Sequence, residues 1–208
     1  MSVAARVAQP LLSEAVGRRA ERPVSPLFLE RWSPRAFTDA PIPEETLLNI
    51  FEAARWAPSA YNAQPWRFVY ARRGAAAWND FVNVLLPFNQ AWAKSAAALV
   101  VVLSNPSFTL PGTTEPTTLA SASFDAGAAW ASFSYQAHEF GWATHAMGGF
   151  SLEAAQRLVK APVDYRVEAV VAIGKRGNPE ALPETLRERE RPSQRRPIGE
   201  TVFVGALT

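Results

Sequence analysis

The segment RWSPRAF, residues 31–37, places two arginines and a serine within five positions. Guanidinium groups bind phosphate through paired hydrogen bonds and stay charged, and a serine hydroxyl offers a further donor. Arg31, Ser33 and Arg35 could therefore hold an anion, but the same residues could form an ordinary solvated turn. Features elsewhere in the chain decide between these two interpretations.

The composition indicates a globular protein with a substantial core. The chain has 208 residues, of which 48% are apolar, including seven tryptophans and twelve phenylalanines. This length suits one domain, and this apolar content argues against disorder. The net charge is only +2, and the densest charged run, residues 187–196, alternates Glu with Arg at its start. We interpret that run as a solvated surface rather than a nucleic-acid-binding face.

Several kinds of site and location are excluded by what the sequence lacks. It contains no cysteine, which excludes disulfides, thiolate nucleophiles, iron–sulfur clusters and cysteine-ligated zinc. Its best apolar run, residues 95–103, is far shorter than the ~18 residues of a membrane helix. Residues 1–24 show no secretory h-region, and Pro10 and Glu14 argue against a transit peptide. We expect a cytoplasmic protein without membrane association, in which residues 1–24 form a loose arm before a single domain at 25–208.

Apolar periodicity and turn signals predict a mixture of helices and strands. Helices are expected over residues 25–32, 43–57, 75–86, 88–93, 121–140 and 151–159. Strands are expected over residues 66–71, 96–104, 141–147 and 165–174. Residues 58–66 and 105–120 are expected to be loops, and residues 200–207 a late strand or an arm that lies on a partner.

The helix expected over residues 121–140 has small side chains nearly all round. No side of the helix is fully polar, and further small residues occur on its other faces: Gly127, Ala128, Ala131, Ser132 and Ser134. A helix of this kind is buried either centrally or at a subunit contact. One face of the helix is expected to carry Ala122, Ala126, Ala129, Phe133, Ala137 and Phe140.

Familiar catalytic motifs are missing from the sequence. HEFGW, residues 138–142, begins like a zinc-protease motif but has Trp142 in place of the second histidine, so we interpret His138 as a hydrogen-bonded helix residue. No glycine-rich run precedes Lys175, and neither G-x-S-x-G nor G-x-G-x-x-G occurs. Because no catalytic side chain and no metal site is indicated, an enzyme with this sequence would rely on a bound cofactor.

Four polar segments at element boundaries remain as candidates for binding a cofactor. They are residues 31–35, PSAYNAQPW at 58–66, MGGF at 147–150 and the arginine pair at 195–196. Arginine and serine suit a phosphate, amides and hydroxyls suit a heteroaromatic ring, and a glycine pair lets backbone N–H groups approach a ring closely. Taken singly, each segment fits an ordinary surface turn or loop better.

The order and spacing of these segments resemble the nitroreductase family, whose members are flavin mononucleotide (FMN) enzymes. The matching order runs between residues 28 and 204. It begins with R-x-S-x-R-x-F, a helix and A-P-S-x-x-N-x-Q-P-W, and it continues with a helix of small residues, M-G-G-F and a late R-R-P. The resemblance implies an α+β fold in which helices flank a mixed, mainly antiparallel sheet. It also implies an obligate homodimer that carries the flavin at its subunit interface.

The resemblance assigns cofactor-binding roles to the residues at matching positions. Those around the FMN phosphate are Arg31, Trp32, Ser33, Arg35 and Arg196, with Arg195 as the alternative to Arg196. Those along the ribityl chain and the isoalloxazine are Pro58, Ser59, Asn62 and Gln64, and those near the reactive N5 edge are Met147, Gly148 and Gly149. Loop 58–66 departs from the family pattern, because it offers no lysine or arginine for the pyrimidine edge of the flavin, although Arg67 follows it.

The activity that the resemblance implies is an FMN-dependent oxidoreductase. NADH or NADPH would give hydride to flavin N5, and a small nitroaromatic or quinone acceptor would then take it in a ping-pong cycle. Alternatives are a flavin reductase or another reductive activity of the same kind, and a flavin-binding protein with little turnover. The interpretation of the chain as a nucleic-acid-binding module depends only on the arginine-rich tail, and we expect no nucleic-acid partner.

Overall fold

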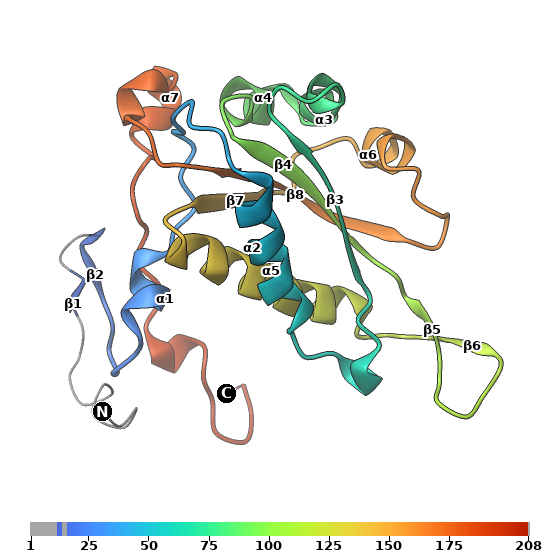
Figure 1. Cartoon of the computed structure of the whole chain (residues 1–208). Coiled ribbons are helices and arrows are strands. Elements are labelled where there is room, and N and C mark those ends of the chain that lie inside the picture. Colours follow the sequence, from blue (N-terminus) through green and yellow to red (C-terminus); the bar gives the residue numbers. More distant parts are fainter. Residues whose placement is uncertain (1–11, 14–15, 208) are drawn as a thin grey trace. The chain divides into compact units, whose positions relative to one another are not determined.

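The computed structural model of the chain describes residues 12–13 and 16–207 (Figure 1). They fall into two compact units. The larger unit is Ser33–Glu190, and the smaller one combines Met1–Trp32 with Arg191–Thr208. The boundary between the two units therefore lies inside the RWSPRAF segment.

The larger unit is built on a four-stranded sheet in the order β3-β4-β8-β7. The strands are β3 (Trp66–Arg72), β4 (Ala98–Ser104), β8 (Arg166–Gly174) and β7 (Ala143–Met147). Neighbouring strands in this sheet pair antiparallel, and the register of β4 on β8 shifts between Val102 and Leu103. Helices packed on an antiparallel sheet confirm the predicted α+β class.

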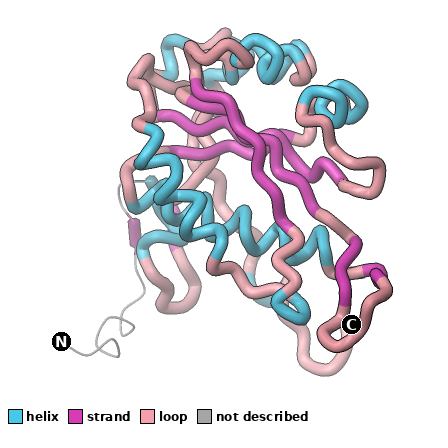
Figure 2. The backbone as a smooth tube through the Cα atoms, turned by 45° about the vertical axis from the view of Figure 1, so that its right-hand side comes forward, coloured by secondary structure: helices cyan, strands magenta, loops and turns pink. Residues whose placement is uncertain are grey.

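Helices cover both faces of this sheet (Figures 1 and 2). On one face lie α2 (Glu44–Arg55) and α5 (Ala122–Glu139), and on the other lie α3 (Trp78–Asn83), α4 (Pro87–Ala93) and α6 (Leu152–Leu158). All seven residues of β4 are buried. Because strand side chains alternate, Leu99, Val101 and Leu103 belong to one core cluster, whereas Ala98, Val100 and Val102 belong to the other.

The predicted helix signals are confirmed at several ends. Helix α2 begins directly after Pro43 with Glu44 and Glu45 in its first turn, where the helix dipole favours acidic residues. The Ser151 hydroxyl caps α6 by accepting a hydrogen bond from the Ala154 N–H at 3.3 Å. The helix expected over residues 75–86 is shorter than predicted and covers only α3.

Helix α5 is buried on one side and exposed on the other. The predicted core residues from Ala122 to Ala137 are buried, but Phe140 is the C-cap residue and is 44% exposed. Phe140, which was expected on the same helix face as these residues, is not buried with them because the helix ends at Glu139. Phe124, which is 81% exposed, and Gly127 lie on the uncovered side.

Two segments differ from their prediction. Residues 105–120 are not a plain loop, because β5 (Ser107–Thr109) and β6 (Pro116–Thr118) form a short antiparallel hairpin. Residues 200–207 form no strand: Glu200 ends the short 3₁₀ helix η5 (Ile198–Glu200), and a turn at Thr201 and a bend at residues 204–206 follow it. The larger unit also contains η3 (Ala60–Asn62), η4 (Pro179–Ala181) and α7 (Glu184–Arg187).

The smaller unit contains α1 (Pro26–Glu30), η5 and a two-stranded sheet of β1 (Leu12–Ser13) and β2 (Arg18–Arg19). Ser25 occupies the N-cap of α1 and Pro26 its first turn, as predicted, although the serine side chain makes no capping hydrogen bond. Among the residues that the structure describes, no helix is both long and apolar enough to cross a membrane.

Candidate functional site

The residues predicted to bind a cofactor are divided between the two units. Arg31, Trp32, Arg195 and Arg196 belong to the smaller unit. The larger unit holds Ser33, Arg35, Pro58, Ser59, Asn62, Gln64, Met147, Gly148 and Gly149.

In the larger unit, the segment after Ser33 is held by partners that lie far away in the sequence. The Oε1 atom of Glu190 accepts hydrogen bonds from the backbone N–H groups of Arg35 at 2.7 Å and of Ala36 at 2.8 Å. His145, on β7, donates from Nδ1 to the carbonyl of Pro34 at 3.0 Å. Three hydrogen bonds thus fix the backbone on both sides of the Arg35 side chain.

Glu190 corrects one sequence expectation. It lies in the charged run that we predicted to be a solvated surface, yet its side chain is only 2% exposed. Its Oε2 atom lies 3.9 Å from Nη1 of Arg35. Burial lowers the pKa of the Arg35 guanidinium, the charge of Arg189 lowers it further, and Glu190 opposes both. Arg35 therefore has a carboxylate partner within its own unit.

The buried ends of this pair still have free hydrogen-bonding capacity. Nε of Arg35 and Oε2 of Glu190 are buried and make no hydrogen bond with the described residues. A buried charged donor without a partner is unfavourable unless a ligand or water satisfies it. The donor chemistry of Arg35 therefore fits an anion, even though part of its charge is already balanced.

Loop 58–66 has an unusual backbone. Tyr61, Asn62 and Gln64 have positive φ values of 53°, 53° and 49°. This left-handed region is uncommon for residues other than glycine, and such residues cluster at binding sites. Within the loop, Ser59 Oγ accepts from the Gln64 N–H at 3.0 Å, and the Gln64 side chain donates from Nε2 to the Asn62 carbonyl at 3.1 Å.

Asp125 anchors this loop, and the sequence interpretation missed it. It is buried in the first turn of α5, where Oδ2 accepts from the Ala60 N–H at 3.2 Å and from the Ser121 hydroxyl at 3.0 Å. The available signal was its place in α5, where an acidic residue interrupts the core-facing side between Ala122 and Ala126.

Two further contacts surround the loop. Arg67 folds back and donates from Nη1 to the carbonyls of Gln64 at 3.0 Å and Trp66 at 2.7 Å, so its guanidinium contacts the loop that lacks a cation of its own. The ring of Tyr61 stacks on Phe108 of β5, with ring centroids 5.4 Å apart. The hairpin of residues 105–120 therefore contacts the candidate loop directly.

The two glycines of MGGF have different surroundings. A Cβ atom added to Gly149 would lie 2.6 Å from Nδ2 of Asn89, which donates to the Gly149 carbonyl at 3.0 Å. A Cβ atom added to Gly148 would meet nothing within 4 Å. A side chain at position 149 would thus displace the Asn89 amide of α4, whereas Gly148 borders open space that a ligand could use. Met147, the last residue of β7, is buried.

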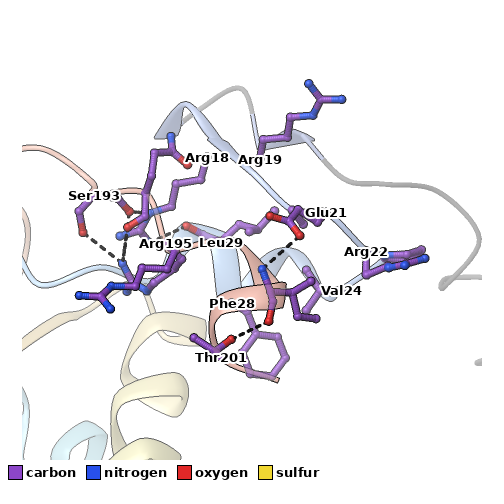
Figure 3. A pocket seen from close by; sticks show the side chains of 15 residues that line it. Arg18, Arg19, Glu21, Arg22, Val24, Phe28, Leu29, Ser193, Arg195 and Thr201 are labelled. Carbon is purple, nitrogen blue, oxygen red and sulfur yellow. Dashed lines mark hydrogen bonds between the residues drawn. The ribbon is translucent and has the colours of Figure 1, made fainter. Parts of the chain in front are cut away.

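The smaller unit has a pocket of about 410 Å³ between its two chain segments, residues 18–29 and 193–201 (Figure 3). Arg195 and Arg196 both line it. Arg18, which the sequence interpretation did not single out, is buried there and donates hydrogen bonds to three backbone carbonyls. Nε1 of Trp32 is buried and has no hydrogen-bond partner in the described part of the chain.

The donors present in each unit fit a phosphorylated heteroaromatic ligand. Arginine side chains occur in both units, and the larger unit adds amide, hydroxyl and backbone groups from loop 58–66. Among the described residues, no group of three or more histidine, aspartate or glutamate residues is arranged to hold a metal ion.

Comparisons with known proteins agree with these observations. The sequence model of the Nitroreductase family matches residues 29–175. The crystal structure of an oxidoreductase containing FMN is 46% identical to this chain, covers 95% of it and 99% of its own length, and superposes with a TM-score of 0.90.

Two curated proteins match shorter segments. An oxygen-insensitive NADPH nitroreductase of Helicobacter acinonychis is 43% identical over 63 residues, which is 29% of this chain and 28% of that protein. An NADH dehydrogenase of Thermus thermophilus is 52% identical over 44 residues, 21% of this chain and 22% of that protein. The chain matches between 22% and 41% of the length of these and two further curated relatives.

Proposed function

The chain belongs to the nitroreductase family of oxidoreductases, and from this membership we propose that it binds FMN and uses NADH or NADPH as its electron donor. The observation that carries the proposal is its similarity, over nearly its whole length, to a crystallised oxidoreductase containing FMN. When bound, FMN would supply hydride transfer at N5, first from the nicotinamide and then to a nitroaromatic or quinone acceptor.

The proposed phosphate-binding residues are Arg31, Trp32, Ser33, Arg35 and Arg196, with Arg195 as the alternative to Arg196. Guanidinium groups neutralise a phosphate dianion through charge-assisted hydrogen bonds. The unsatisfied Nε of Arg35 supports its inclusion. Glu190 and His145 position this segment through its backbone, and Nε of Arg35 keeps an unused donor.

The proposed ring-binding residues come from loop 58–66 and from MGGF. Pro58, Ser59, Asn62 and Gln64 would line the ribityl chain and the ring, in a conformation that Asp125 maintains. Gly148 would leave space for the ring edge, because a side chain there would point into open space. Arg67, held against the loop, would supply positive charge near the pyrimidine edge.

We also propose that the protein is a homodimer with the cofactor at its subunit interface. The uncovered side of α5 supports this, because Phe124 and Gly127 are exposed on a helix that otherwise packs against the sheet. Small residues along that side would allow close approach of a second copy.

An absorption spectrum of the purified protein, followed by anaerobic addition of NADH and NADPH, tests the proposal. We expect a flavin spectrum that one or both nicotinamides bleach and that a quinone or nitroaromatic restores. A colourless protein that takes up no FMN would refute the cofactor. A yellow protein that neither nicotinamide reduces would refute the activity and favour a flavin-binding role.

A further inference from the structure

Arg18 has an unusual position for an arginine. It lies in the stretch that we expected to form a loose arm, yet it is only 5% exposed. Arginine is almost never fully buried unless its donors are satisfied. Here Nε donates to the Ser193 carbonyl at 2.8 Å, and Nη1 donates to the carbonyls of Leu29 and Arg31, both at 2.9 Å.

These three acceptors belong to two chain segments that are far apart in the sequence. Leu29 lies in the last turn of α1 and Arg31 is its C-cap residue, so their carbonyls are among those that a helix end leaves without partners. Ser193 precedes the Arg195–Arg196 pair by two residues. The guanidinium of Arg18 is therefore hydrogen-bonded to the backbone at Arg31 and to the backbone beside Arg195 and Arg196. These are the arginines of the smaller unit that are proposed to bind the cofactor phosphate.

Neighbouring contacts bring the same segments together. Gln194 donates from Nε2 to the Gly17 carbonyl at 2.6 Å, and the Ile198 N–H donates to Glu21 Oε2 at 3.2 Å. Figure 3 shows Arg18 beside Ser193, Leu29 and Arg195, whereas Arg19 extends away from them. Arg19 is exposed.

The charges around Arg18 oppose this arrangement. Burial lowers the pKa of its guanidinium, and the positive charges of Arg195 and Arg31 lower it further. Like charges brought together in a partly buried place repel one another, and a bound anion would relieve the repulsion. The hydrogen bonds of Arg18 thus hold together two segments that each bring an arginine close to it.

We propose that Arg18 is a positioning residue for the phosphate of FMN: it holds the backbone of Arg31 and that of residues 193–196 at a fixed separation, so that their side chains can bind the phosphate together. This inference rests on the proposed function. Arg18 itself has its donors directed at carbonyls and is not assigned a contact with the cofactor.

Comparison of FMN with riboflavin, which lacks the phosphate, tests this role. Dissociation constants for both flavins are measured on the flavin-stripped full chain, and their ratio reports the contribution of the phosphate. Arg18→Met keeps the length and apolar stem but removes the donors. We expect it to reduce the FMN preference by about tenfold or more, the effect of losing one charge-assisted hydrogen bond, with riboflavin affinity changed less than about twofold.

Two further variants make the test specific. Arg19→Ala removes a positive charge next to Arg18 in the sequence, and its preference for FMN should stay within about twofold of the wild type, because exposed charges are screened. Arg18→Lys keeps the charge but cannot reproduce the planar fork, so it should show the same selective loss to a smaller extent. If Arg18→Met does not fold, the test compares the FMN preference of Arg18→Lys with that of Arg19→Ala. A lower preference in Arg18→Lys alone would support the positioning role of Arg18.

The outcomes separate the inference from the proposed function. Equal losses of FMN and riboflavin affinity, an unchanged ratio, or an equal effect of Arg19→Ala would each overturn the positioning role. A wild-type protein that binds no flavin would instead refute the proposed function, and the inference would fall with it.

Discussion

At the scale of single residues, Arg35, which was predicted to share one role with Arg31, has a defined partner within its own unit. Arg35 is paired with the buried carboxylate of Glu190, which also holds two backbone N–H groups. Removing Arg35 would leave that carboxylate buried without its cation.

We therefore expect Arg31→Ala and Arg35→Ala both to yield flavin-poor protein, and Arg35→Ala to lose stability as well. The expected decrease in the free energy of unfolding is about 1–3 kcal/mol for an unsatisfied buried group. Urea unfolding of the flavin-free variants measures it. The double variant Arg35→Ala/Glu190→Gln should regain part of the stability and none of the flavin. Full yellow colour and unchanged FMN affinity in both single variants would contradict the phosphate assignment.

The two adjacent glycines of MGGF should respond oppositely to the same small change. Gly149→Ala would displace the Asn89 amide and break its hydrogen bond to the Gly149 carbonyl, so it should destabilise the protein by about 0.5–1.5 kcal/mol. Gly148→Ala should leave stability nearly unchanged and slow the anaerobic bleaching of the flavin by NADH or NADPH. Urea midpoints and stopped-flow bleaching rates are the two measurements. If Gly148→Ala bleaches at the wild-type rate, Gly148 does not border the reacting ring.

At the scale of elements, local patterns predicted the helices and strands whose apolar residues repeat over a full turn or more. The buried strands β4 and β8, the acidic start of α2 and the Ser151 cap are all readable within a few residues of sequence. The hairpin of β5 and β6 was missed, because each strand has only three residues and carries no clear alternation.

Site features that depend on distant contacts could not be predicted in the same way. Glu190 lies 155 residues from Arg35 in the sequence, and Arg18 lies 175 residues from Ser193. No periodicity connects such positions, so a run of alternating charges looked like solvated surface. The motif residues themselves could be assigned because the family resemblance supplied their order, and those assignments stay predictions.

Helix α5 provides a test at this scale. Gly127 is exposed and a Cβ atom there would meet nothing within 4 Å, so Gly127→Leu should not disturb the isolated chain. Leucine should even raise helix stability by roughly 0.5–1 kcal/mol. At a subunit contact, however, it would prevent close approach. We expect dimer dissociation and flavin loss to occur together, whereas Glu153→Leu on α6 should leave both unchanged. A Gly127→Leu protein that stays dimeric and yellow would exclude this side of α5 from the interface.

At the scale of the whole molecule, the proposal predicts a dimer that works in two separate half-reactions. Light scattering should give twice the chain mass of 22.7 kDa for the FMN-bound protein. The sequence has no dinucleotide-binding fingerprint that would suggest a second nicotinamide site. Donor and acceptor should therefore use one site in turn, and double-reciprocal plots should be parallel as the acceptor is varied. Intersecting lines would require both substrates to bind together.

The left-handed backbone of loop 58–66 sets a limit on thermostability engineering. Tyr61 and Gln64 occupy a region that is costly for side chains of their kind, by about 1 kcal/mol or more each. Glycine at either position would relieve this energy, and a screen for heat resistance would select such variants readily. The added stability would come from releasing the backbone conformation of a loop that we propose shapes the flavin site. The more thermostable variants should therefore bind FMN with lower affinity. Directed evolution of this protein would therefore need to select for retained colour together with melting temperature.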